Sequence, residues 1–171
     1  MLLYEDKIKE NRPEFVAKVK QISTALNIEP DWLQVIMYHE SRFNHRVINS
    51  IGAVGLIQIM PDTARGLGTT NQALAAMSNV QQLDYVYQYF KPAKGKFKTF
   101  EDLFLYNFFP IAVGKPDDWV LRSSHLSAEA VAKSNKPFDL NNDNQITVGE
   151  WKQYLRNFLR KNNIIIPQKK S

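Results

Sequence analysis

The chain has no cysteine, and this absence removes two kinds of chemistry at once. Neither a disulfide framework nor a thiolate nucleophile is available to any of its 171 residues. The absence is compatible with oxidising and reducing compartments alike. The sequence also lacks a run of about 18 apolar residues, so we expect no membrane span. Its first ten residues become charged too early for a signal peptide, and we expect no secretory leader there.

Several catalytic motifs are missing as well. The histidines do not form the H-E-x-x-H pattern of zinc proteases, because His45 lies too far beyond His39 to share its helix face. No G-x-S-x-G nucleophile elbow is present for Ser-His-Asp catalysis. The paired carboxylates of most glycosidases are not evident, since Asp62 is better explained as an acid that stabilises a helix start.

The charge pattern argues against nucleic acid as a partner. The net charge is +5, but basic residues are scattered among acidic ones and no RNA-binding fingerprint is present. A hydrophobic content of 44% and an aromatic content of 12% can supply a core, which excludes a disordered chain. We therefore expect a folded protein that binds no nucleic acid.

Apolar residues recur with helical spacing throughout, and no long alternating run indicates a sheet. The predicted fold class is therefore all-α. We expect a main helical domain in residues 1–125, and a helix-loop-helix in residues 126–171 that packs on the same core. The predicted helices cover residues 11–26, 30–43, 61–67, 71–76, 79–90, 99–110, 127–135 and 148–161.

One carboxylate stands out in the second predicted helix, which starts at Pro30. Glu40 continues the apolar face of that helix, which is formed by Leu33, Ile36 and Met37. Burial there would raise the pKa of Glu40 and suit it to general-acid catalysis. An acid that reaches solvent or pairs with Arg42 or Arg46 is the commoner explanation of this pattern alone.

The segment after Glu40 suggests a binding cleft. Gly52 and Gly55 permit a sharp turn or a close approach of the backbone. Gln58 lies among apolar residues, where a buried amide needs hydrogen-bond partners. Those partners are sugar groups in a cleft or, alternatively, backbone groups of the protein itself. Pro61 then begins a short helix.

These residues resemble the soluble lytic transglycosylase (SLT) family, a relative of goose-type lysozymes. The family pattern E-S-x-(F/W)-N-P, followed by G-A-x-G-L-x-Q-I-x-P-x-T-A, matches residues 40–64 almost without gaps. His45 and Val54 depart from it, where the family usually has Pro and often Ser. A downstream A-Y-N-x-G element is matched more weakly by Tyr106 and Asn107, because bulky residues replace its small ones.

The resemblance implies a lysozyme-like fold and cleavage of peptidoglycan glycan strands. Glu40 would protonate the oxygen between N-acetylmuramic acid and N-acetylglucosamine and then deprotonate the muramyl 6-hydroxyl, which closes a 1,6-anhydro ring. Ser41, Gln58, Tyr106 and Asn107 would hold the sugar. No cofactor is implied for this chemistry. Hydrolysis by water, as in a muramidase, and an inert wall-binding or scaffold module are the alternatives.

A second motif near the C-terminus resembles the twelve-residue EF-hand loop, which wraps six oxygen ligands around calcium. Asn144 occupies the position where Gly is expected, and Asn tolerates the left-handed conformation required there. Thr147 and Glu150 also form a capping box, which needs no metal. We expect structural Ca²⁺ at this loop. Its predicted ligands are Asp139, Asn141, Asp143, the carbonyl of Gln145, Thr147 and Glu150.

The expected site of action is the bacterial periplasm or cell wall. With no leader recognised, we expect delivery by a phage particle or a secretion machine.

Overall fold

The structure is a computed structural model and describes residues 1–169. Helices dominate it, and this confirms the predicted all-α class. No strand occurs within the described residues, where β-pairing is limited to isolated bridges. None of the helices in residues 1–169 has both the length and the apolar character that a membrane crossing requires.

Residue contacts divide the chain into two compact units. The first comprises Met1–Phe97 together with the C-terminal residues from Pro167, and the second comprises Lys98–Ile166. The helices of the first unit are η1 (Glu5–Lys7), α1 (Arg12–Leu26), α2 (Pro30–Ser41), α3 (Pro61–Gly66), α4 (Asn71–Ala76), α5 (Asn79–Phe90) and η2 (Lys91–Ala93). Those of the second are α6 (Phe100–Phe108), η3 (Pro110–Ala112), α7 (Ala128–Ser134), η4 (Lys136–Phe138) and α8 (Val148–Lys161).

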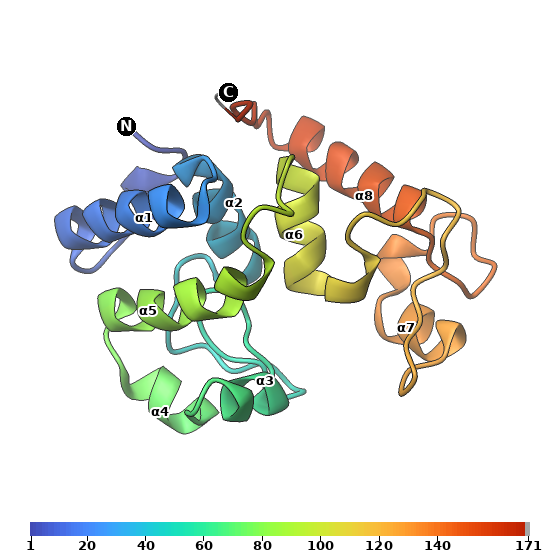
Figure 1. Cartoon of the computed structure of the whole chain (residues 1–171), viewed down its shortest axis with the longest axis horizontal. Helices are drawn as coiled ribbons and strands as arrows, with labels where there is room; N and C mark the ends of the chain where they lie inside the picture. Colours follow the sequence, from blue (N-terminus) through green and yellow to red (C-terminus); the bar gives the residue numbers. More distant parts are fainter. Residues whose placement is uncertain (170–171) are drawn as a thin grey trace. The chain divides into compact units, whose positions relative to one another are not determined.

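The core of the first unit forms where α1 packs against α2 and α5 (Figure 1). Apolar residues at helical spacing turn inward from all three helices, and Phe15, Leu33 and Leu83 are fully buried. The Trp32 indole is also buried, and its Nε1 donates a hydrogen bond to Pro167 O at 2.8 Å. That bond fastens the C-terminal residues to the first unit.

Helix starts follow the capping signals of the sequence. Thr99 caps α6. Its hydroxyl accepts a hydrogen bond from Asp102 N, and the Asp102 carboxylate accepts one from Thr99 N. Ser78 caps α5 through a capping box with Gln81, and the helix begins at Asn79. Asn79 is buried, and its amide donates to Glu10 O at 2.7 Å. Its side chain therefore joins α5 to the segment before α1.

Aromatic packing forms the core of the second unit. Phe104 of α6 meets Trp151 of α8 edge to face, with ring centroids 5.7 Å apart. Phe108 stacks nearly parallel to Trp151 and contacts Phe138 of η4 edge to face at 4.9 Å.

Candidate functional site

Glu40 lies in the last turn of α2. The apolar face below it is completely buried in the first unit, whereas the Glu40 side chain retains 21% of its surface exposed. The carboxyl is therefore half-buried at the edge of a rigid helix and accessible from solvent. This position combines the fixed geometry and the access that a general acid needs.

The chain turns sharply directly after Glu40 and Ser41. Arg42 and Phe43 both adopt the left-handed conformation, with φ of 53° and 61°. Phe43 then packs edge to face on Phe15 of α1, at a centroid distance of 6.0 Å. Burial of an aromatic ring offsets the backbone cost of two successive left-handed residues. The turn thus fixes where α2 ends and where the following loop begins.

Ser41 connects the end of α2 to that loop. Its buried hydroxyl lies 3.1 Å from the carbonyl oxygens of both Met37 and Leu56. A hydroxyl has one proton, so it donates to one of these acceptors at a time. The contact brings the residue after Glu40 against the segment that carries Gln58. The predicted role of Ser41 in holding sugar stays a prediction.

The loop is held in shape by a small set of backbone pairs. Val54 exchanges two hydrogen bonds with Ile59, at 2.9 and 2.8 Å, and it also forms a bridge with Ile48. The Asn71 amide donates to the carbonyl oxygens of Gly52 and Ile59 from α4. These bonds hold the glycine-bearing segment as a defined structure beside the end of α2.

Gln82 of α5 is the central polar residue of this region, and its role was not predicted from the sequence. Its buried Oε1 accepts from Leu56 N at 2.7 Å. Its Nε2 donates to His45 O and Leu74 O, both at 2.9 Å. The sequence carried one signal, because Gln82 precedes Val86 by one helical turn and so shares its buried face.

Gln58 adopts the left-handed conformation, with φ of 56°, and is half-buried. Its Nε2 donates to Gly55 O at 3.2 Å. One partner of the amide is therefore a backbone group, which was the alternative to a sugar. The side-chain oxygen retains acceptor capacity, and the second amide hydrogen is a further donor. A non-glycine residue in this conformation carries a backbone cost, a feature that concentrates at functional sites.

His39 is the polar neighbour of the Glu40 carboxyl. Its Nδ1 lies 3.4 Å from Glu40 Oε1. This contact was not predicted from the sequence, because residues adjacent in a helix usually point in different directions. At the last turn of α2 the two side chains nevertheless meet, which restricts the orientation of the carboxyl.

Tyr106 and Asn107 lie on α6, in the second unit. Both are half-buried, and burial raises the pKa of the Tyr106 hydroxyl. The hydroxyl therefore stays protonated and can donate a hydrogen bond at neutral pH. The expectation that these residues hold sugar together with Glu40 stays a prediction.

The predicted calcium loop lies between η4 and α8 of the second unit. Asp139 accepts hydrogen bonds from Asp143 N and Asn144 N, at 3.2 and 3.0 Å. Asn141 Oδ1 accepts from Asp143 N at 2.9 Å, and Asp143 Oδ1 accepts from Gln145 N at 2.9 Å. These bonds direct the side-chain oxygens inward and leave lone pairs on each of them.

Two further features of the loop agree with the sequence. Asn144 has φ of 64°, so Asn does adopt the left-handed conformation at the position where Gly was expected. Ile146 O accepts from Leu121 N at 2.8 Å, beside a bridge between Val120 and Thr147. The loop and the connector before α7 therefore form a short β contact.

The capping box at the start of α8 is also formed. Glu150 Oε2 accepts from both the backbone N–H and the hydroxyl of Thr147, each at 2.9 Å. Glu150 Oε1 is buried and has no hydrogen-bond partner. Within residues 1–169 no group of three His, Cys, Asp or Glu side chains suffices by itself to hold a metal. The predicted set also uses amide, hydroxyl and carbonyl oxygens, so the calcium site stays a prediction.

Comparison with known proteins gives two matches. Residues 18–102, about half of the chain and including Glu40, match the family model of the Transglycosylase SLT domain. A protein of Enterobacteria phage PRD1 described as "Transglycosylase" is 41% identical over 49 residues. That alignment spans 29% of this chain and 18% of the phage protein. Both matches support the SLT family for the aligned segment and, coarsely, a transglycosylase that cleaves glycosidic bonds.

Proposed function

We propose that this chain, whose residues 18–102 match the transglycosylase SLT domain, is a peptidoglycan lytic transglycosylase with Glu40 as its single acid and base. The observation that carries the proposal is the position of Glu40. Its half-buried but solvent-accessible carboxyl lies at the end of a helix with a buried apolar face, and the next residue contacts the loop that carries Gln58.

The proposed reaction uses one carboxyl twice. Protonated Glu40 donates its proton to the oxygen that links muramyl C1 to N-acetylglucosamine, and the C1–O bond breaks. The acetamido group of the same muramyl residue stabilises the positive charge at C1. Ionised Glu40 then accepts the proton of the 6-hydroxyl, and O6 bonds to C1. Atoms balance without water, and the carboxyl ends protonated as it began.

Contacts of the first unit suit this double role. His39 restricts the carboxyl from one side, while Ser41 fixes the helix end against the loop. The free polar atoms of Gln58 are the proposed hydrogen-bonding groups for a sugar in this unit. Tyr106 and Asn107 are proposed as further sugar-binding residues on the strength of the family resemblance.

The decisive test is Glu40→Gln with purified peptidoglycan as substrate. Loss of the proton donor should lower the release of muropeptides by about 10²- to 10⁴-fold, with unchanged thermal unfolding. Glu14→Gln is the matched control, because Glu14 is an exposed acid on α1 of the same unit. Comparable turnover by Glu40→Gln and Glu14→Gln would disprove the assignment.

Mass spectrometry of the products identifies the reaction type. A transglycosylase releases 1,6-anhydro muropeptides, which are lighter by one water than the products of a muramidase. Products of the heavier kind alone would assign the protein to hydrolysis. Binding to peptidoglycan without any soluble product would indicate a non-catalytic wall-binding module.

We further infer that residues 139–150 bind calcium as a structural ion. The inward oxygens of this loop and the partnerless Glu150 Oε1 support the inference. Calcium prefers six to eight oxygen ligands, and the loop offers them at the usual spacing. The ion would cancel the repulsion between the carboxylates of Asp139, Asp143 and Glu150 and take no part in bond cleavage.

Delivery by a phage particle is also proposed. The relative in Enterobacteria phage PRD1 supports it, because that protein is encoded by a virus. Purified particles that carry this chain should then cleave peptidoglycan in a gel overlay. A chain absent from particles and found in the medium or periplasm of uninfected cells would point to a secretion machine.

A further inference from the structure

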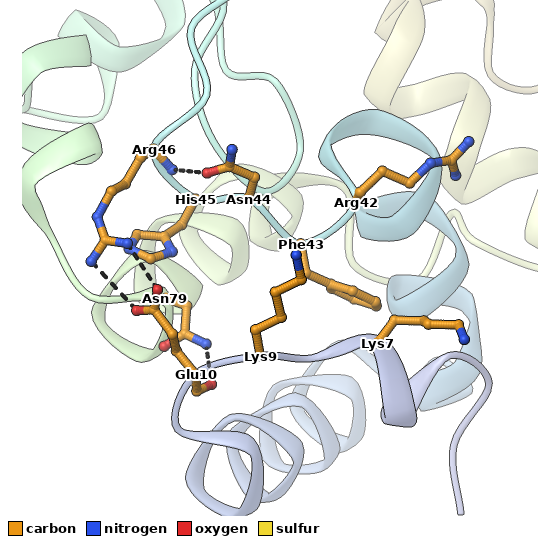
Figure 2. A pocket seen from close by; sticks show the side chains of 9 residues that line it. All are labelled: Lys7, Lys9, Glu10, Arg42, Phe43, Asn44, His45, Arg46 and Asn79. Atoms are coloured by element: carbon orange, nitrogen blue, oxygen red, sulfur yellow. Dashed lines mark hydrogen bonds and ion pairs between the residues drawn. The ribbon is translucent and has the colours of Figure 1, made fainter.

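A second polar site lies just beyond the end of α2, where residues 7–10 pass residues 42–46 (Figure 2). The cavity between these segments has a volume of about 240 Å³ and is lined by four cationic side chains and one carboxylate. The cations are Lys7, Lys9, Arg42 and Arg46, and the carboxylate is Glu10. We call it the basic pocket.

One wall of the basic pocket is formed by residues 42–46, and local backbone structure sets the directions of its side chains. Burial alternates along residues 42–46, with Phe43 and His45 buried and the residues beside them exposed. The Asn44 side chain accepts from Arg46 N at 3.0 Å, which fixes the turn between the two arginines. The two arginine side chains are thereby held on the outer face of the segment.

The opposite wall, formed by residues 7–10, is also held by a buried neighbour. Ile8 is extended, with φ of −75° and ψ of 116°, and is only 1% exposed. Because successive side chains of an extended chain alternate in direction, Lys7 and Lys9 both turn away from the core. Figure 2 shows Lys9 extending toward Phe43. The cations are therefore positioned by buried neighbours rather than by a loose surface segment.

The pocket has a surplus of positive charge. Arg46 pairs with Glu10 at 2.9 Å, and Lys7 pairs with Asp6 at 2.8 Å. Within residues 1–169, Lys9 and Arg42 form no ion pair with a carboxylate. The Arg42 guanidinium covers the Tyr38 ring at 4.3 Å and donates one hydrogen bond to Tyr38 O, which leaves most of its donors free.

The size of the pocket limits what it accepts. Its volume equals that of about eight liquid waters, which is room for an anionic end group and less than a drug-sized ligand fills. His45 adds a further polar group, because its Nε2 is buried without a hydrogen-bond partner. A small oxyanion is the group whose charge and acceptors complement the Lys9 ammonium, which Figure 2 shows extending between the two segments, in a pocket whose rim includes Arg42.

We propose that the basic pocket binds a free carboxylate of the peptide stems of peptidoglycan. The proposal rests on the proposed function, since a glycan strand at Glu40 carries its peptide stems along the protein surface. Arg42 follows Glu40 by two residues, so the pocket begins at the helix end that bears the catalytic carboxyl. Carboxylate binding there would orient a glycan strand. It would also give peptide stems with free carboxylates a higher affinity than stems with amidated ones.

The test measures binding of free stem peptides to the full chain by NMR titration. The first probe is the stem tripeptide with free carboxylates, and the second is the same tripeptide with its carboxylates amidated. The acidic probe should shift the backbone amides of residues 7–10 and 42–46 and bind more weakly as salt increases. Lys9→Gln should weaken its binding by about two- to fivefold.

Lys20→Gln is the matched control, because Lys20 is an exposed lysine on α1 outside the pocket. Equal binding of both peptides, or equal affinity of Lys9→Gln and Lys20→Gln, would overturn the proposal. So would inorganic phosphate, as a third probe, if it bound as tightly as the acidic tripeptide. The probes contain no glycosidic bond, so a failure here leaves the cleavage reaction at Glu40 untouched.

Discussion

The side-chain amide of Gln82 occupies the space beside Gly55 in which any other residue would place its Cβ. A Cβ added to Gly55 would overlap Oε1, Cδ and Nε2 of Gln82. Gly55 also has φ of 77°, so two independent constraints require glycine here. The glycine of the family motif therefore allows one buried amide to hold the loop from Leu56 to His45.

Gly55→Ala should lower the free energy of unfolding by about 2–4 kcal/mol, from the left-handed backbone plus the displaced Gln82 side chain. Denaturant unfolding measures this change. Gly66→Ala in α3 is the control, since a Cβ there meets nothing within 4 Å. That control should be neutral or slightly stabilising. Equal effects of the two substitutions would contradict the packing argument.

Gln58→Gly separates function from stability at the loop. Glycine removes the backbone cost of the left-handed conformation and loses the hydrogen bond to Gly55 O, so stability should change by less than about 1 kcal/mol. If Gln58 holds the sugar, muropeptide release should fall by about ten- to hundredfold. Calorimetry and a turnover assay on the same sample measure both. If the free energy of unfolding and the turnover both fell strongly, Gln58 would be a purely structural residue.

Acid should destabilise the first unit through His45. Burial lowers the pKa of His45, and the adjacent Arg46 lowers it further, while Glu10 opposes them. Below pH of about 6.5 the unfolded chain binds the proton first, so unfolding becomes easier as pH falls toward the folded-state pKa. The slope contributed by this one group is at most about 1.4 kcal/mol per pH unit.

Well above pH of about 6.5, the contribution of His45 to the free energy of unfolding is constant, because the imidazole is neutral in both the folded and the unfolded state. His45→Gln should remove this part of the pH dependence, which is measured by thermal unfolding between pH 5 and 8. Direct NMR titration of the imidazole gives the folded-state pKa. An imidazole that titrates at or above its ordinary value of 6.5 would refute the expectation.

Calcium should raise the melting temperature of the chain, and a chelator should reverse the change. At a hundredfold excess over Kd, binding to the folded state alone adds about 2.7 kcal/mol. Asp139→Asn keeps one of the two oxygens that accept backbone hydrogen bonds and removes one charge. The calcium-free stability should therefore fall by no more than about 1.5 kcal/mol, while the calcium effect declines. Asp118→Asn, an exposed acid outside the loop, should respond like the parent chain. Identical calcium responses in all three proteins would exclude Asp139 as a ligand.

The helices of this protein were predictable because their signals are local. Pro30 starts α2 and Thr99 caps α6, as the sequence predicts. The position of Glu40 at the end of a buried helix face also follows from spacing along one helix. The predicted end of α2, residue 43, lies beyond the observed end at Ser41. The left-handed turn that begins at Arg42 depends on the packing of Phe43 against Phe15, which is distant in the chain.

The sequence by itself determined the helical class, the helix starts and the candidate acid, since each depends on residues within a few turns of one another. Only the tertiary structure decided that Gln82 supports the loop, that Ser41 contacts Leu56 and that Lys9 and Arg42 line one pocket. Those pairs join segments distant in the chain. Which distant groups meet is set by how whole helices pack, and periodicity along one segment carries no information about that.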